Sequence, residues 1–425
     1  MSVTIVAKPI YFPRSRRRCY DLRNDLPSWA EAAQPVVIVK PYHKLSGGHW
    51  RLFWFIICGM NIRTHICVLL VSLLSACQSI PSKPVVLSTP VPAITLEPTA
   101  THVVPSPTST VAQLIYPYTI DGLRHHNYQS GNISIVSTLS KTDFYTGYLI
   151  NYPSDGLTIS GILQVPTSGH PPYPVIVMDH GYFNREDYTS GDGTDRAAEY
   201  LNMHGYLTVS SDYRSWGKSD IGTSIYYSGL AIDVLNLISA VPSIPQADST
   251  RIGIWGHSMG GGVTMKVLEV SSKIKAAVLY STVSADDADV LARWGLGCIG
   301  DIAAGEHQLG CNSSDVVPLD LPPDLIKAYY ESSTDSEILH QTSSFYHLDL
   351  ITAPIEINYG TDDGKILAGT PPEWSKKLYQ AFKDAGKYAH LFAYDGELHS
   401  FNGDNWIAFM ERSAHFFDQY VKNGP

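Results

Sequence analysis

The sequence lacks the residue patterns that hold metals and nucleotides. No group of Cys and His residues has metal-site spacing, and no G-x-G-x-x-G follows an expected strand. We therefore expect no metal and no other cofactor. Charged residues are also scarce, at 16% of the 425 residues, and acidic residues outnumber basic ones by 40 to 30. This balance disfavours nucleic acid as a partner, because binding a phosphate backbone requires cationic patches.

The chain has an apolar run near its N-terminal end that is too short to span a membrane. This run, residues 66–74, is preceded by Arg63 and His65, which interrupt any extension. It follows Met60 and ends in Leu-Ser-Ala directly before Cys77. A positive start, a short apolar core and small residues before a cleavage point are typical of a secretory signal. With cysteine at that point, the segment resembles a bacterial lipoprotein signal, which implies that Cys77 carries lipid.

This resemblance divides the chain into segments. Residues 60–76 are expected to form the signal peptide, and residues 77–112, rich in Pro, Ser and Thr, an extended tether. Residues 113–425 are left for the folded domain. For residues 1–59, the simplest explanation is a gene start placed too far upstream, with Met60 as the initiator; the alternative is a basic leader that the cell uses. The signal implies a bacterial protein outside the cytoplasm, anchored to the membrane on its periplasmic side or at the cell surface.

Cysteine is scarce, with six residues in the whole chain. Three of them precede Cys77, which takes the lipid in the lipoprotein interpretation. The two that remain are Cys298 and Cys311. A pair left over in an exported domain indicates a disulfide, so we expect these two to be bonded.

The most informative motif is centred on Ser258. Residues 256–260 read Gly-His-Ser-Met-Gly, after an expected buried strand at 251–255 and at the start of an expected helix at 258–270. In this context a G-x-S-x-G sequence forms a sharp turn that exposes the serine hydroxyl above a sheet and points the N–H of Met259 towards it. We therefore expect Ser258 to be a nucleophile.

A serine hydroxyl needs a base that takes its proton and a third group that orients the base. Two adjacent carboxylates, Asp362 and Asp363, follow an expected strand at 353–359, and His399 follows another at 388–394. Open α/β sheets place their sites at the carboxyl ends of the strands. We expect His399 to be the base and one of the two aspartates to orient it.

The order Ser, Asp, His along the chain resembles the α/β-hydrolase superfamily. The family pattern Gly-x-x-Asp-x-x-Val after the acid-bearing strand is matched from Gly360 onward, with Ile at its last position, and favours Asp363 over Asp362 as the acid. The family histidine is commonly followed by an aromatic residue two positions on, as His399 is. The remaining histidines have weaker cases, and His257 inside the motif is expected to be a packing residue.

The resemblance also implies an oxyanion hole made of two backbone N–H groups. One N–H belongs to Met259. The other should follow the strand expected at 174–179, where residues 180–183 read His-Gly-Tyr-Phe, and by position it belongs to Tyr182. This loop has one glycine where lipase-type loops have three, which weakens a specific lipase assignment.

The resemblance runs from about residue 145 to the C-terminus and implies the α/β-hydrolase fold, a doubly wound, mostly parallel sheet with an antiparallel hairpin at its N-terminal edge. Alternation at 155–166 predicts a strand and its hairpin partner. A long gap between strands 6 and 7 predicts a lid at about 283–350. Within the superfamily, the prolyl-oligopeptidase and acetyl-esterase branch is the most similar. Helices are expected at 195–204, 226–241, 258–270, 372–385 and 405–421.

These residues together predict an extracytoplasmic, lipid-anchored serine hydrolase that cleaves carboxylic esters through an acyl-enzyme. Its substrate would be a small-molecule ester or a short peptide. A serine peptidase of the prolyl-oligopeptidase type is the alternative within enzymes. A non-catalytic hydrolase-fold protein that binds a partner is a further alternative, and the intact Ser, Asp and His argue against it.

Overall fold

The computed structural model describes residues 109–128, 131–300 and 311–424. The expectations for residues 1–59, the signal at 60–76, the lipid on Cys77 and most of the tether lie outside the described residues.

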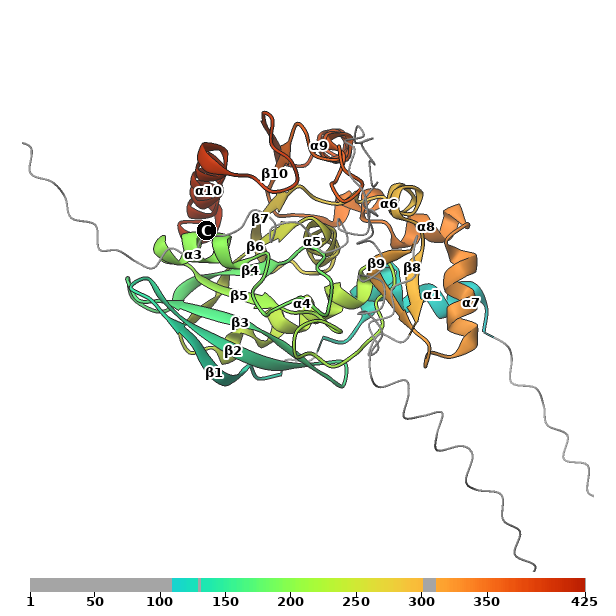
Figure 1. Ribbon diagram of the computed structural model, residues 1–425, viewed down its shortest axis with the longest axis horizontal. Coiled ribbons are helices and arrows are strands. Elements are labelled where there is room, and N and C mark those ends of the chain that lie inside the picture. The colour runs from blue at the N-terminus through green and yellow to red at the C-terminus, as the bar shows by residue number, and fades with distance from the viewer. Residues whose placement is uncertain (1–108, 129–130, 301–310, 425) are drawn as a thin grey trace, which may run out of the picture. The chain divides into compact units, whose positions relative to one another are not determined.

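A nine-stranded sheet forms the centre of the described domain (Figure 1). Its strands lie in the order β1-β2-β3-β5-β4-β6-β7-β10-β11. The pairs β1–β2, β2–β3 and β3–β5 are antiparallel, and all other neighbours are parallel. The strand bounds are Ser134–Lys141 (β1), Tyr145–Ser154 (β2), Leu157–Pro166 (β3), Tyr173–Asp179 (β4), Leu207–Ser211 (β5), Ala247–His257 (β6), Ile274–Tyr280 (β7), Ile355–Gly360 (β10) and Ala389–Tyr394 (β11).

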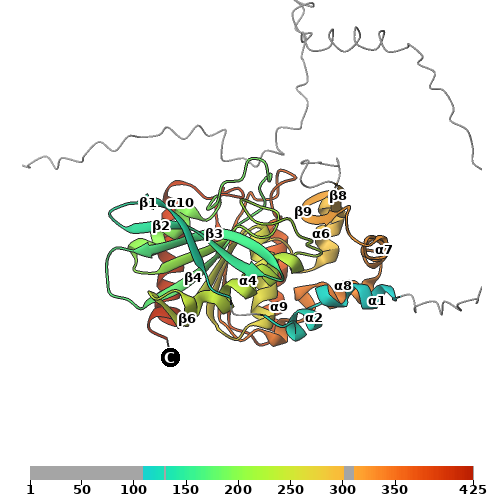
Figure 2. The ribbon, with the colours of Figure 1, turned by 90° about the horizontal axis from the view of Figure 1, so that it is seen from below.

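Helices cover both faces of the sheet, so its central strands are largely buried. Helices α4 (Ser228–Ala240), α5 (Met259–Val270) and α9 (Pro372–Asp384) share one hydrophobic core with the sheet. Helices α3 (Asp195–Met203) and α10 (Gly403–Phe417) form a second core on the opposite face (Figures 1 and 2). All residues of β4, β5 and β10 are buried.

The doubly wound, mostly parallel sheet predicted from the sequence is confirmed. The alternating stretch at 155–166 is one strand rather than a strand and its partner. It forms β3, its partner is the preceding β2, and Asp155 and Gly156 make the turn with φ of 49° and 82°. The expected helix at 405–421 is divided, because α10 continues into a π-helical turn at Asp418–Lys422. Strand β1 was not predicted, since seven of its eight residues are exposed at the sheet edge, polar and apolar alike.

An insertion between β7 and β10 forms the predicted lid. It contains helices α6 (Asp287–Trp294), α7 (Pro323–Ser332) and α8 (Ser336–Thr342), and a separate two-stranded sheet of β8 (Gly297–Gly300) and β9 (Asn312–Pro318). This small sheet has no amphipathic pattern long enough to predict it. In Figure 1 the lid elements gather at one end of the central sheet.

The lid also packs on the segment that leads into the domain. Helix α1 (Val111–Ile115) begins two residues before the expected domain start at residue 113. Its Ile115 forms a small core with Ala328 of α7 and Ile338 of α8. A second short helix, α2 (Ile120–His125), packs against α4 through Leu123. The start of the folded domain is therefore part of the lid's packing.

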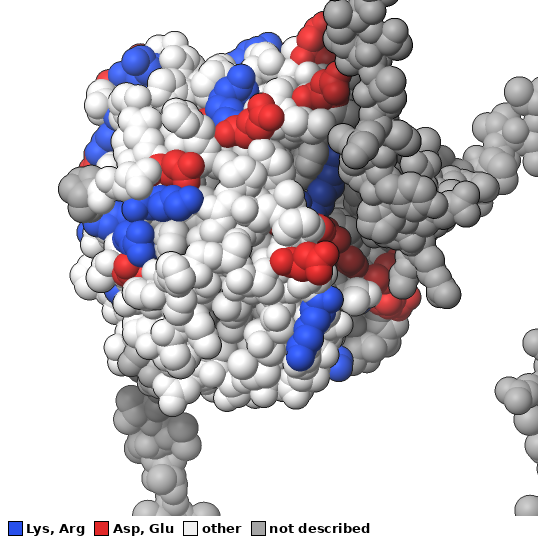
Figure 3. Space-filling model, turned by 90° about the vertical axis from the view of Figure 1, so that its left-hand side faces the viewer, with Lys and Arg blue, Asp and Glu red and all other residues white. Residues whose placement is uncertain are grey.

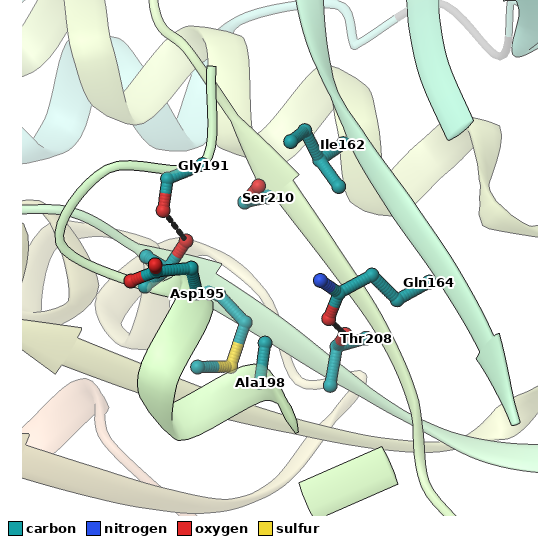
Figure 4. A pocket seen from close by; sticks show the side chains of 9 residues that line it. Ile162, Gln164, Gly191, Asp195, Ala198, Thr208 and Ser210 are labelled. Carbon is teal, nitrogen blue, oxygen red and sulfur yellow. Dashed lines mark hydrogen bonds between the residues drawn. The ribbon is translucent and has the colours of Figure 1, made fainter. Parts of the chain in front are cut away.

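One enclosed cavity lies between the sheet and α3 (Figure 4). Its volume of about 10 Å³ is at the lower limit for a single water molecule. Two hydrogen bonds cross its lining, from Thr208 to Gln164 at 3.1 Å and from Thr194 to the carbonyl of Gly191 at 3.1 Å. The cavity is therefore too small for a substrate.

The face of the domain in Figure 3 carries scattered charged side chains of both signs with uncharged surface between them. Within the described ranges, no helix has the length and apolar composition needed to cross a membrane.

Candidate active site

The sharp turn at Ser258 has the strained geometry that the motif predicts. Ser258 lies between the end of β6 and the start of α5, with φ 56° and ψ −121°. This positive φ is costly for a residue with a side chain. A Cβ on Gly260 would clash with the carbonyl oxygen of Asp179, and one on Gly256 with the hydroxyl of Thr264. The two glycines therefore allow the close packing that holds the turn.

The structure brings His399 and Asp363 to this serine. The Nε2 atom of His399 lies 2.8 Å from Ser258 Oγ. The Nδ1 atom lies 3.0 Å from Oδ2 and 3.1 Å from Oδ1 of Asp363. With its proton on Nδ1, the imidazole donates to the carboxylate and accepts from the serine hydroxyl. The arrangement can therefore take a proton from Ser258 and stabilise the resulting cation.

Asp363 is held as a carboxylate by several donors. Its side chain is 0% exposed. The N–H groups of Gly364 and Thr370 donate to Oδ1 at 2.8 and 2.9 Å, and the Thr370 hydroxyl lies 2.8 Å from Oδ2. Burial raises the pKa of Asp363, but the charge of His399 and the hydrogen bonds from His399, Thr370 and Gly364 outweigh it, so the pKa lies below its usual value. Asp363 is therefore ionised at neutral pH.

Asp362, the other sequence candidate, pairs with a lysine instead of the histidine. Its side chain is 35% exposed and its Oδ2 lies 2.6 Å from Nζ of Lys365. The structure therefore brings Asp363, and not Asp362, within hydrogen-bonding distance of His399.

The sequence interpretation of His257 as a packing residue is incomplete. The ring is half-buried and stacks on Tyr280 at 4.4 Å between centroids. Its Nε2–H also donates to the backbone carbonyl of His399 at 3.1 Å. Burial and the charge of His399 lower the pKa of His257 to about 3, so the ring is neutral. His257 therefore links the nucleophile turn to the loop that carries the base.

The loop expected to complete the oxyanion hole lies against the nucleophile. A Cβ on Gly181 would be 3.1 Å from Cβ of Ser258 and 3.3 Å from Nδ1 of His257. Glycine thus allows this loop to approach the serine. Met259 is the first residue of α5, where N–H groups have no partner within the helix. Tyr182, directly after Gly181, is half-buried.

Known proteins resemble the chain in sequence and in fold. A model of the serine aminopeptidase S33 family matches residues 171–308. The lysophosphatidylserine lipase ABHD12 of Xenopus tropicalis is 33% identical over 96 residues, 23% of this chain and 23% of the relative. The uncharacterized peptidase YuxL of Bacillus subtilis (strain 168) is 23% identical over 283 residues, 63% of this chain and 38% of the relative. The chain thus spans less than half the length of these curated relatives.

Among solved structures, the acetyl xylan esterase from Paenibacillus sp. R4 superposes with a TM-score of 0.50 at 17% identity, covering 75% of this chain and 97% of that one. This likeness concerns the fold. Together with the strand order and the strained turn at Ser258, it decides the classification. The chain has the α/β-hydrolase fold.

In this α/β-hydrolase the lid contacts the loop that bears Asp363. Arg293 of α6 donates to the carbonyls of Gly364 and Ile366 at 3.2 and 2.9 Å. Trp294 donates from Nε1 to the carbonyl of Leu367 at 2.8 Å. The sequence did not connect Arg293, Trp294 or Thr370 with Asp363, because no motif of fixed spacing relates these residues to it.

The lid of this α/β-hydrolase contains the expected disulfide. Cys298 in β8 is bonded to Cys311 just before β9, with their Cα atoms 5.0 Å apart. Among the residues that the structure describes, no three His, Cys, Asp or Glu side chains are arranged to hold a metal ion.

Proposed function

We propose that this α/β-hydrolase is a serine hydrolase that cleaves carboxylic esters through an acyl-enzyme on Ser258. One observation carries the proposal. A continuous chain of hydrogen bonds runs from Ser258 Oγ through His399 to the buried Asp363, at the carboxyl edge of the parallel strands.

The geometry suggests the following steps. Ser258 Oγ attacks the ester carbonyl carbon while its proton passes to Nε2 of His399. The N–H groups of Met259 and Tyr182 are the proposed donors to the negative oxygen. The tetrahedral intermediate expels the alcohol, which takes the proton from His399. Water then attacks the acyl-enzyme with His399 as base, releasing the acid and restoring Ser258.

We favour an ester as the bond that is cleaved, because the lysophosphatidylserine lipase is 33% identical over its matched part and the peptidase YuxL is 23% identical. Purified protein treated with a fluorophosphonate probe should be labelled at Ser258, and the Ser258→Ala variant should not be labelled. The same variant should lose turnover of 4-nitrophenyl acetate. A matched control is Ser281→Ala, at the end of β7, which should still be labelled. Labelling that persists in Ser258→Ala contradicts the nucleophile assignment.

A serine peptidase is the second candidate, favoured by the serine aminopeptidase family model and by the peptidase YuxL. An aminopeptidase needs acidic side chains to hold the free amino terminus of its substrate. Comparing kcat/KM for short-chain 4-nitrophenyl esters with that for aminoacyl 4-nitroanilides separates the two. Anilides are intrinsically less reactive than esters. A kcat/KM for the anilides above the value expected from this lower reactivity favours the peptidase.

We also propose that the enzyme is a bacterial lipoprotein that acts outside the cytoplasm, with its lipid on Cys77. Support comes from the signal at 60–76 and from the Pro/Ser/Thr-rich tether after it. Two acyl chains suffice for stable attachment, whereas one gives marginal binding. Expressed from Met60 in a bacterial host, the protein should partition into a detergent phase, and Cys77→Ser should abolish this. Identical fractionation of both as soluble protein contradicts the anchor.

A further inference from the structure

Arg185 follows the proposed oxyanion loop, residues 180–183, and its guanidinium has contacts on two sides. Its guanidinium lies 4.6 Å from the centroid of the Trp216 ring. Trp216 is itself fixed by a hydrogen bond from Nε1 to the carbonyl of Phe183 at 3.0 Å. On the other side, NH2 of Arg185 donates to the carbonyl of Ser313 in lid strand β9 at 3.2 Å. The guanidinium is therefore positioned between the loop and the lid.

The charge of Arg185 has no counter-ion among the described residues. No Asp or Glu in those ranges lies within ion-pair distance of it. Its Nε is buried and has no hydrogen-bond partner. Burial lowers the pKa of Arg185 to about 10, which leaves it cationic at neutral pH. A largely desolvated cation is usually paired, so one without a counter-ion just after the proposed oxyanion loop requires an explanation.

We propose that Arg185 determines specificity by binding an anionic group, a carboxylate or a phosphate, on the ester that Ser258 cleaves. This inference rests on the proposed function. Stacking on Trp216 fixes the plane of the guanidinium, and its Nε has no hydrogen-bond partner among the described residues. A planar guanidinium held in this way suits the bidentate geometry of such anions.

The chain limits how far this cation can lie from the nucleophile. A Cβ on Gly181 would lie 3.1 Å from Cβ of Ser258, and Arg185 follows Gly181 by four positions along the chain. An extended chain of that length spans at most about 14 Å between Cα atoms. Tyr182 lies between them, with its ring 6.4 Å from that of Trp216, and the charge of Arg185 acts on its hydroxyl. An anion carried on a short acyl or alcohol chain fits this separation.

The test compares matched esters with one enzyme. The mono-4-nitrophenyl esters of succinate and glutarate carry a free carboxylate. Their neutral counterparts are the same compounds with that carboxylate converted to a methyl ester. A 1-acyl-glycerol 3-phosphate paired with the corresponding monoacylglycerol provides the phosphate pair. Each is assayed with the wild type, Arg185→Gln, Arg185→Lys and the control Arg251→Gln. Arg251 is bonded to Asp248 near the amino end of β6, opposite to the nucleophile.

The wild type should prefer the anionic member of at least one pair. Arg185→Gln should lower kcat/KM for that member by about tenfold or more, mainly through KM, as expected for loss of a charged hydrogen bond. It should leave the neutral member unchanged, and Arg185→Lys should keep part of the preference. The pair that responds identifies carboxylate or phosphate.

The absence of any anionic preference in the wild type overturns the proposal. So does an equal loss on both members in Arg185→Gln, which would assign the residue a structural role. Failure of the serine-hydrolase function has a different signature, because turnover of the neutral esters would then survive in Ser258→Ala.

Discussion

Replacing Asp363 by Asn tests whether this carboxylate orients the base. Asn has the same shape but presents an N–H₂ group to His399 in place of an acceptor. The imidazole would then carry its proton on Nε2 instead of Nδ1. Because Nε2 faces Ser258, it could no longer accept the proton of the serine hydroxyl. Loss of this kind in known triads costs about 10⁴-fold in kcat, which corresponds to about 5.4 kcal/mol.

Asp362→Asn is the matched control, because it makes the same chemical change one residue away. Asp362 pairs with Lys365 in a partly exposed position, and such surface pairs contribute about 1 kcal/mol or less to stability. We expect kcat to change less than about fivefold in this variant. The assay is kcat for 4-nitrophenyl acetate at saturating substrate, with thermal unfolding to establish that both variants fold. The reverse ranking of the two variants, or a loss under tenfold in Asp363→Asn, would refute the reasoning.

Three further predictions concern other parts of the domain. His257→Phe keeps an aromatic ring but removes the donor to the carbonyl of His399, so kcat should fall about tenfold; an unchanged kcat would show that the bond does not position the base. Replacing Cys298 and Cys311 by Ser opens a loop with a sequence separation of 13 and should lower the free energy of unfolding by about 3 kcal/mol in denaturant titration; unchanged stability contradicts this. Burial raises the pKa of Glu269 to about 8, so its contribution to stability is present below its unfolded pKa and is lost as pH rises through 8. Glu269→Gln should therefore narrow the stability difference between pH 5 and pH 9, and an equal difference in both proteins would argue against a protonated Glu269.

Local pattern is enough to predict Ser258, because the geometry of its turn is determined within a few residues. Glycines stand at the positions where a Cβ would clash, and strand and helix signals flank them. Asp363 and His399 are predictable for another reason. Each follows a parallel strand, and parallel strands bring their carboxyl ends to one edge.

Thr370 and the hydrogen bond of His257 could not be predicted, because neither depends on local pattern. His257 reaches a carbonyl 142 residues away along the chain. Thr370 reaches Asp363 only because the loop between them folds back on itself. Both depend on how loops close after the sheet has formed. A sequence pattern predicts helices and strands but not the closure of the loops between them. The edge strand β1 was missed for a related reason, since its exposed faces carry no regular alternation.

The lid contacts two parts of the proposed site, the loop that bears Asp363 and the side chain of Arg185. These contacts indicate which part of the protein selects the substrate. Through Arg293 and Trp294 it holds the loop of the acid, and through the carbonyl of Ser313 it holds Arg185. The nucleophile turn, by contrast, is formed where β6 meets α5. In the proposed enzyme, chemistry therefore resides at the sheet edge and substrate selection in the inserted segment. A change in the lid should alter KM for different esters before it alters the reactivity of Ser258 towards a fluorophosphonate.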